Sequence, residues 1–273
     1  GFNIRNQAHR MADEIDLTAL HCYKSIKADR AYCSIGTLGG GNHFIEVDQD
    51  ENGDSYLVIH SGSRRLGLEV TNYYFRAGKV YLREKGCVIP HELTHLEGEL
   101  MQQYLEDIQI VQKFAAINRE AILTEIVKGM KWKVQESYSC IHNYVESAET
   151  SYTGAPIIRK GAISAKKGEK VIIPVNMQVG IILGTGKGND AWNQSVPHGA
   201  GRLYKRSDMR QNFTVSQFKK AMAGIYSSCV SEGTLDEAPF AYRNLEDILQ
   251  VIGDTVDVDQ VIHPIYNYKA GNE

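Results

Sequence analysis

Apolar positions along this chain follow two spacings, and each spacing predicts a different element. Short apolar runs bounded by glycine, proline or polar turns predict buried strands at residues 56–60, 170–174 and 179–184. A glycine-dense turn over residues 36–47 ends in alternating apolar residues, which indicates a loop leading into a strand. The last such run, residues 261–268, predicts a final strand or extended segment.

The strongest helical pattern covers residues 90–130. Apolar residues recur there at spacings of three or four, and the pattern ends near Lys128 and Gly129: Leu96, Leu100, Tyr104, Ile108 and Val111. This periodicity predicts two consecutive helices or one long bent helix over about 91–130. A shorter helix is expected over residues 244–258. With no repeat or clear linker, the elements together predict an α+β fold in one domain over residues 1–273.

Composition narrows the class of protein. With 273 residues, 42% of them hydrophobic, the chain can bury a sizeable core, and its formal net charge of -3 gives no global attraction for nucleic acid. Any contact with nucleic acid must therefore come from local clusters of basic residues. Five scattered cysteines without a CxxC pair favour a reducing cytoplasm. No apolar stretch approaches the length of a membrane span, so a membrane partner is not expected.

Four histidines carry candidate chemistry. His43, His60 and His142 each lie at or just beyond a short apolar run, beside Asn, Ser or Gly. Each alone is more often structural, but three in matching positions indicate imidazoles that converge on one metal ion. His198 opens the sequence His-Gly-Ala-Gly-Arg, in which Arg202 can clamp a phosphate. That histidine is equally compatible with a nucleophile toward an activated phosphate and with a buried residue in a glycine-rich turn.

A competing motif lies at the start of the helical region. His91-Glu-Leu-Thr-His95 matches HExxH, in which two histidines one helical turn apart bind zinc and Glu92 serves as the base of a metallopeptidase. Pro90 precedes the motif and favours a helix start there. The extended motif would require histidine at Met101, and Glu120 or Glu125 would have to serve as a more distant third ligand.

Four motifs in one order resemble those of the RtcB family of RNA ligases. They are Gly-Thr-Leu-Gly-Gly-Gly-Asn-His-Phe-Ile-Glu-Val, Val-Ile-His-Ser-Gly-Ser-Arg, Ile-His-Asn-Tyr and His-Gly-Ala-Gly-Arg. The similarity extends over about residues 35–269, through Phe114-Ala-Ala-Ile-Asn-Arg, the Arg159-Lys-Gly-Ala turn, Ile173-Pro-Val-Asn-Met, Asp236-Glu-Ala-Pro and Tyr268-Lys269.

The resemblance implies a GTP-dependent and manganese-dependent ligase that joins RNA 3′-phosphate or 2′,3′-cyclic phosphate ends to 5′-hydroxyl ends. His198 would attack the α-phosphate of GTP and carry the guanylate. Two manganese ions would be held by an upstream Asp-x-x-Cys and by His43, His60 and His142. The resemblance also assigns residues to the nucleotide, namely Asn42, Glu46, Asn176, Gly199, Ala200, Gly201, Tyr242 and Lys269. Arg64 and Arg202 would contact RNA phosphate, and an activating protein is a further expected partner.

Three departures from the family pattern qualify these expectations. No Asp-x-x-Cys is present, because neither Cys22 nor Cys33 follows an aspartate at that spacing. A serine common in the family is replaced by Lys205, and a usual glycine by Val175. The chain is therefore expected to lack an N-terminal segment of the family. An inactive relative that binds nucleotide or RNA is the remaining alternative, beside the metallopeptidase.

Overall fold

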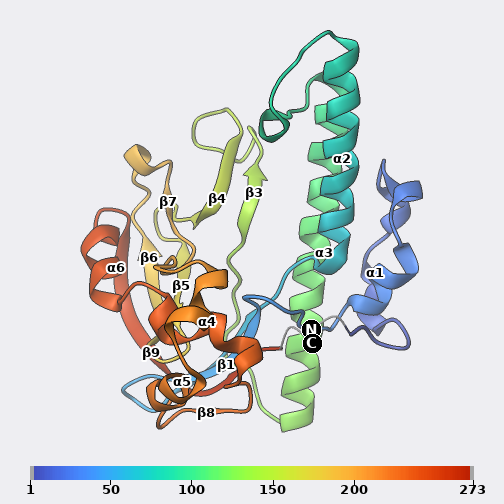
Figure 1. The fold of residues 1–273 in the computed structure, drawn as a ribbon. Helices are drawn as coiled ribbons and strands as arrows, with labels where there is room; N and C mark the ends of the chain where they lie inside the picture. The colour runs from blue at the N-terminus through green and yellow to red at the C-terminus, as the bar shows by residue number, and fades with distance from the viewer. Residues whose placement is uncertain (1–2, 271–273) are drawn as a thin grey trace. The chain divides into compact units, whose positions relative to one another are not determined.

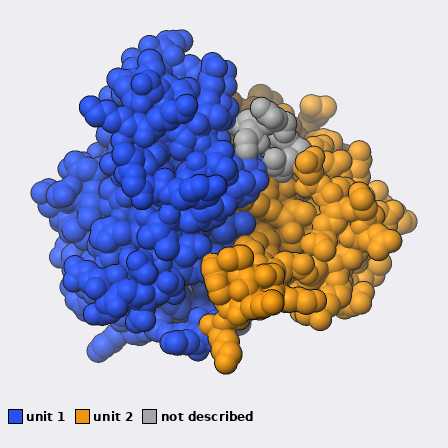
Figure 2. All heavy atoms as spheres, turned by 90° about the horizontal axis from the view of Figure 1, so that it is seen from below, with its two compact units in different colours: residues 1, 40–60, 134–273 blue, residues 2–39, 61–133 orange. Residues whose placement is uncertain are grey.

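The computed structural model describes residues 3–270, which divide into two compact units (Figures 1 and 2). The sheet unit contains residues 40–60 and 134–270, and the helical unit contains residues 3–39 and 61–133. All strands among these residues belong to the sheet unit. The two described helices longer than twenty residues, α2 (Arg64–Glu84) and α3 (Gly98–Met130), belong to the helical unit. The α+β fold class predicted from the sequence is confirmed.

The sheet unit contains a larger and a smaller antiparallel sheet. The larger has the order β2-β1-β9-β6-β5, with the short β8 parallel to β9. Its strands are β1 Phe44–Gln49, β2 Ser55–His60, β5 Lys170–Asn176, β6 Gly180–Gly186, β8 Tyr226–Ser227 and β9 Val256–Tyr268. The smaller has the order β3-β4-β7, with β3 His142–Glu146, β4 Ile157–Ser164 and β7 Ser195–Pro197. Strand β9 pairs with β6 along its first half and with β1 along its second half.

Short helices cover parts of the sheet unit. These are α4 Met209–Asn212, α5 Val215–Ala221 and α6 Leu245–Ile252, with 3-10 turns at Asp190–Trp192, Arg206–Asp208, Glu232–Glu237 and Pro239–Ala241. Helix α6 begins after Asn244, whose side chain accepts a hydrogen bond from the Asp247 backbone N–H. Its buried Ile248 and Ile252 pack with the apolar residues of β5 and β6. Burial of this apolar face is what attaches α6 to the larger sheet.

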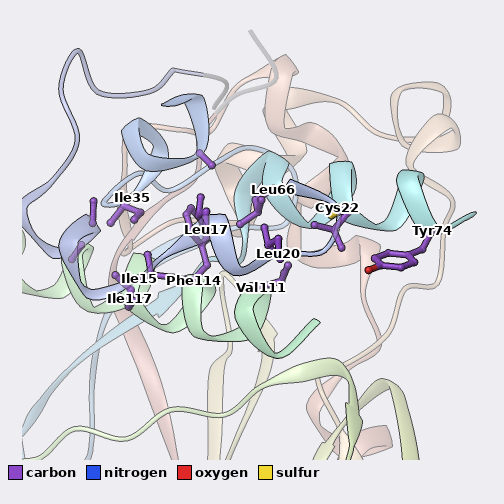
Figure 3. Close-up of a cluster of buried hydrophobic side chains, with 14 residues drawn as sticks. Ile15, Leu17, Leu20, Cys22, Ile35, Leu66, Tyr74, Val111, Phe114 and Ile117 are labelled. Atoms are coloured by element: carbon purple, nitrogen blue, oxygen red, sulfur yellow. The ribbon is translucent and has the colours of Figure 1, made fainter. Parts of the chain in front are cut away.

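The helical unit is built on α2 Arg64–Glu84 and α3 Gly98–Met130, with α1 Ala28–Ser34 and 3-10 turns at Arg10–Glu14, Leu17–Ala19, Tyr23–Ser25 and His91–Leu93. Helix α2 buries every fourth residue, namely Leu66, Val70, Tyr74, Gly78 and Leu82. Figure 3 shows side chains from α2, α3 and the N-terminal turns pointing toward one another in this core. No helix within residues 3–270 has the length and apolar character needed to cross a membrane.

The structure confirms the predicted strands and corrects several boundaries. The helix expected over about 91–130 begins at Gly98, and residues 91–93 form only a 3-10 turn. The helix expected over 244–258 ends at Ile252, because β9 begins at Val256. The turn expected at residues 159–162 lies inside β4, where Gly161 with φ +67° gives a local irregularity. Helix α2 is the one long element without a prediction.

Candidate functional site

Four histidines of the sheet unit lie in a row. His43 precedes β1, His60 ends β2, His142 begins β3 and His198 follows β7. Successive ring centroids are 5.7 Å apart for His43 and His60, 5.4 Å for His60 and His142, and 4.7 Å for His142 and His198. The β1–β2 pairing, in which Phe44 is opposite His60, sets the first distance. The four histidines that the sequence singled out therefore converge.

Hydrogen bonds at Gly161 connect Asn143, the neighbour of His142, to His198. The Gly161 N–H donates to Asn143 Oδ1 at 2.9 Å, and the His198 N–H donates to the Gly161 carbonyl at 3.3 Å. A Cβ on Gly161 would lie 3.6 Å from His198 Cε1, so the glycine lies directly against the imidazole. Asn143 itself has φ +59°, a left-handed conformation that asparagine tolerates better than most residues. The conformations of β3 and β4 thus fix the position of His198.

The environment of His60 favours its neutral form. Burial lowers the pKa of His60 well below its usual value, and the neighbouring His142, His43, Lys269 and His198 lower it further. The Nε2 atoms of His60 and His142 face each other at 3.3 Å. A neutral imidazole is the form that binds metal ions, because its nitrogen lone pair is then available.

The spacing of these two nitrogens can be compared with metal geometry. Two imidazole nitrogens bound to one first-row metal ion at about 2.1 Å lie roughly 3.0–3.4 Å apart, depending on coordination number. The pair at 3.3 Å fits two ligands of a single ion. Within residues 3–270, however, no three His, Cys, Asp or Glu side chains form a complete metal-binding group. None of the five cysteines, all of which lie within residues 3–270, forms a disulfide, and Cys22 and Cys33 belong to the helical unit.

Two backbone hydrogen bonds hold the loop that begins at His198. The Ala200 N–H donates to the Pro174 carbonyl at the end of β5 at 3.0 Å, and the Arg243 N–H donates to the Gly201 carbonyl at 3.2 Å. A side chain on Gly199 would meet that same Pro174 carbonyl at 3.2 Å, so a small residue is favoured there. Val175, which stands where the family has glycine, is buried in the apolar core of the sheet unit.

Three of the predicted ligand-binding residues meet at one buried carboxylate, that of Glu237. The Tyr242 hydroxyl donates to Glu237 Oε2 at 2.6 Å, and Lys269 Nζ donates to the same oxygen at 3.0 Å. Arg202 Nη1 is 3.6 Å from Glu237 Oε1 and 3.3 Å from the Tyr242 hydroxyl. Arg206 also pairs with Glu237 Oε1. Sequence reasoning noted the Asp236-Glu-Ala-Pro motif but gave Glu237 no role.

Lys269 connects this carboxylate cluster to the histidine row. Its ammonium lies 5.3 Å from the centroid of the Phe44 ring, and that ring lies edge-on to His60 at 5.2 Å. Lys269 is also one of the charges that lower the pKa of His60. The histidine row and the Glu237 cluster are therefore parts of one site within the sheet unit.

The other residues predicted to bind the nucleotide make contacts outside the Glu237 cluster. Glu46 is buried in β1 and accepts a hydrogen bond from Asn267 Nδ2. Asn176 Oδ1 accepts from the backbone N–H groups of Gln178 and Val179, so it closes the turn between β5 and β6. Asn42 is exposed in the turn before His43. Lys205 is also exposed.

Glu46 has an acidic neighbour that the sequence analysis did not notice. Asp48 is fully buried on the same face of β1, two residues from Glu46. Burial, reinforced by the neighbouring Glu46, raises the pKa of Asp48 to about 9, while burial raises that of Glu46 to about 7. The raised pKa favours the protonated form of Asp48 at neutral pH.

Replacing Asp48 by asparagine should make the protein more stable in alkaline solution. The folded protein retains a proton at Asp48 up to about pH 9, whereas the unfolded chain loses it near pH 4, so stability falls as pH rises between these values. Asparagine keeps the shape without the titration. At pH 9 the Asp48→Asn variant should be more stable by at least about 1 kcal/mol. Urea unfolding at pH 6 and pH 9 measures this, and parallel pH profiles for the two proteins would contradict it.

Arg64, predicted to contact RNA phosphate, belongs to the helical unit. It begins α2 with φ +54°, and its guanidinium donates to Thr37 Oγ1 at 3.0 Å and to the Leu38 carbonyl at 3.3 Å. The buried Asn118 side chain of α3 accepts from the Gly36 N–H at 2.9 Å and donates to the Gly62 carbonyl at 3.0 Å. These contacts hold the glycine-rich loop and the start of α2 together within the helical unit.

The HExxH motif does not have the geometry of a zinc peptidase site, which corrects the helical placement expected from the sequence. His91 lies in a 3-10 turn that ends at Leu93, so His91 and His95 are not on one face of an α-helix. The His91 ring packs on Phe75, and His95 Nε2 lies 3.4 Å from Glu97. Of the more distant candidates, Glu125 pairs with His9 at 3.0 Å.

Comparisons with a family model and with known proteins point to the same family. The model of the family described as tRNA-splicing ligase RtcB matches residues 3–270, across both units. The RNA-splicing ligase RtcB of Escherichia coli is 32% identical over 253 residues, which cover 88% of this chain and 62% of that protein. The tRNA-splicing ligases RtcB of Aeropyrum pernix and Nanoarchaeum equitans are 29% and 26% identical, covering 80% and 90% of this chain and 55% and 61% of their own lengths. The chain thus spans about three fifths of the length of these relatives.

Proposed function

The chain belongs to the RtcB family, and we propose that it acts as an RNA ligase that uses His198 as a guanylate carrier. The observation that carries the proposal is the row of four histidines, with His198 held against His142 and Gly161. The relatives' names describe ligases for RNA and tRNA splicing. RNA with a 3′-phosphate or 2′,3′-cyclic phosphate and a 5′-hydroxyl is the proposed substrate.

The proposed reaction has three steps. A ring nitrogen of His198 attacks the α-phosphorus of GTP, a P–N bond forms, the bond to the β-phosphate breaks, and pyrophosphate leaves while the imidazole loses its proton. The guanylate is then transferred to an RNA 3′-phosphate, which a 2′,3′-cyclic end supplies after hydrolysis. Finally the 5′-hydroxyl of the second RNA end attacks that phosphate, GMP leaves, and a phosphodiester is formed.

Manganese is the proposed metal, with His43, His60 and His142 as ligands. The facing Nε2 atoms of His60 and His142 and the lowered pKa of His60 support such a role. A bound divalent ion would neutralise negative charge on the α-phosphate during attack. His43, His60 and His142 are proposed ligands of one ion, and a second ion of the kind expected from the family would need further ligands, because the chain has no Asp-x-x-Cys.

The other residues would bind and orient the two substrates. Tyr242, Lys269, Glu46, Asn42 and Asn176 are proposed nucleotide contacts, and the Gly199-Ala200-Gly201 backbone allows close approach of a phosphate. Arg202 and Arg64 are proposed contacts for RNA phosphate. Cysteines that form no disulfide within residues 3–270 agree with a proposed cytoplasmic location. An activating protein remains a proposed partner.

Incubation with manganese and GTP labelled at the α-phosphate tests the proposal. The label should become attached to the protein as an acid-labile, alkali-stable adduct, as expected for a phosphoramidate on histidine, and GTP labelled at the γ-phosphate should give none. Mass spectrometry of the digested adduct should find the added mass on the peptide that contains His198. GTP binding without any adduct would instead favour the inactive, nucleotide-binding relative.

A further inference from the structure

Glu237 is a buried carboxylate at the centre of a polar cluster. It is 2% exposed, and it lies in the 3-10 turn Glu232–Glu237, directly before the Pro239–Ala241 turn. Building on the proposed function, we propose that Glu237 is a positioning residue for nucleotide binding, which holds Lys269, Tyr242 and Arg202 in the orientation that the guanylate requires.

The two carboxylate oxygens of Glu237 contact different members of the cluster. Oε2 accepts from the Tyr242 hydroxyl at 2.6 Å and from Lys269 Nζ at 3.0 Å. Oε1 faces two guanidinium groups, those of Arg202 at 3.6 Å and of Arg206. Hydrogen bonds to an ionised acceptor are shorter and about twice as strong as neutral ones, so they hold their donors closely. One carboxylate thus constrains side chains from three separate segments of the chain.

The ionised form of Glu237 is the form that performs this role. Burial alone would raise the pKa of Glu237, but the charge of Lys269, the Tyr242 hydroxyl and the charge of Arg206 outweigh burial and lower it. Together Glu237 and Asp236 face three cations, Arg202, Arg206 and Lys269. The cluster therefore keeps one positive charge in excess, which suits an anionic ligand such as a nucleotide phosphate or RNA phosphate.

The cluster also has a direct structural route to the reacting residue. Arg202 belongs to the loop that begins at His198, and its backbone pairs with that of Tyr242 in an isolated bridge. Its guanidinium lies over the Tyr242 ring, 5.1 Å from the centroid. On the other side, Lys269 lies over Phe44, which contacts His60. A change in Glu237 would therefore affect the loop that carries His198 and the Phe44 ring that contacts His60.

Three variants test this inference, with the affinity for GTP measured by equilibrium binding and the covalent adduct measured separately. Glu237→Gln keeps the shape but removes the charge, and Glu237→Asp keeps the charge but withdraws it by one methylene. Both should weaken GTP binding by roughly 10- to 100-fold, the range expected when charge-assisted hydrogen bonds are lost. Asp257→Asn is the matched control, because Asp257 is an exposed carboxylate of the same unit that pairs with Lys187 at 3.1 Å outside the cluster, and its loss should leave GTP binding within about 2-fold.

A double-mutant cycle separates positioning from general stability. If Glu237 acts through Tyr242, then Glu237→Gln should cost much less GTP affinity in a Tyr242→Phe background than in the unaltered protein. Full rescue of GTP affinity by Glu237→Asp, or strictly additive effects in the cycle, would overturn the inference. If the unaltered protein binds GTP and Glu237→Gln binds it equally well, the inference fails alone. If the unaltered protein does not bind GTP, the proposed function fails and the inference with it.

Discussion

Replacement of His198 by alanine should reduce the covalent guanylate to background, a loss of roughly 1000-fold or more, while GTP binding is largely retained. The imidazole is the proposed nucleophile, and removing a nucleophile eliminates the step rather than weakening it. His142, the nearest imidazole at a centroid distance of 4.7 Å, is proposed as a metal ligand and so cannot substitute. Incubation with GTP labelled at the α-phosphate, followed by electrophoresis, measures the loss of covalent adduct directly.

His263→Ala provides the matched control for this experiment. His263 is an exposed histidine of β9 in the same unit, and its Nδ1 lies 3.0 Å from the Val179 carbonyl. This variant should take up label as the unaltered protein does. Undiminished labelling of the His198→Ala variant would show that another residue carries the guanylate. Loss of labelling in both variants would point to unfolding, which circular dichroism of each variant would detect.

Replacement of Glu146 by alanine should cause the largest loss of stability. Arg159 and Glu146 form an ion pair at 2.5 Å in which both side chains are almost fully buried, and Lys166 Nζ pairs with the other carboxylate oxygen at 2.5 Å. Removing Glu146 leaves the Arg159 guanidinium buried without its counter-charge. The free energy of unfolding should fall by about 3–5 kcal/mol. Urea unfolding followed by circular dichroism measures this difference.

Glu136→Ala serves as the control for Glu146→Ala. Glu136 pairs with Lys170, but both side chains are at least half exposed, so water already solvates them. The variant should change the free energy of unfolding by no more than about 0.5 kcal/mol. Equal losses in the two variants would mean that burial of the Arg159 pair has no special importance. Because Arg159 also donates to the Asn193 carbonyl at 3.1 Å, Glu146→Ala should in addition loosen the segment before β7.

The larger sheet could be predicted from the sequence because its strands are short apolar runs with clear turns between them. Residues 56–60 and 170–174, and all of 179–184 except Val179, lie in strands of the structure. Helix α2 could not be predicted in the same way. It contains Gly67, Gly78 and several aromatic or β-branched residues, which have low helix propensity. Tertiary packing of Leu66, Val70 and Tyr74 stabilises it, and only their spacing of four residues gave a signal.

The histidine row could be expected from the sequence because its residues stand at strand ends beside small polar residues. Glu237 and Asp48 could not, since a single acidic residue gives no sign in sequence that it will be buried. The meeting of Lys269, Tyr242 and Arg202 at Glu237 depends on tertiary contacts between distant segments. The misplaced helical start at His91 has a local cause: Gly98, with φ +57°, interrupts the backbone after the 3-10 turn and sets the start of α3.

The pairing of β9 with β1 has a consequence for how this protein folds during synthesis. Ile45 pairs with Tyr268, so strands that are far apart in the sequence are neighbours in the larger sheet. The β1–β2 hairpin is synthesised well before β9, so Phe44 and Glu46 are exposed until their partner strand has been made. Contacts that close such long loops form slowly and expose intermediates to aggregation. The proposed nucleotide site, which includes Lys269, is therefore complete only after β9 has been synthesised and has paired with β1.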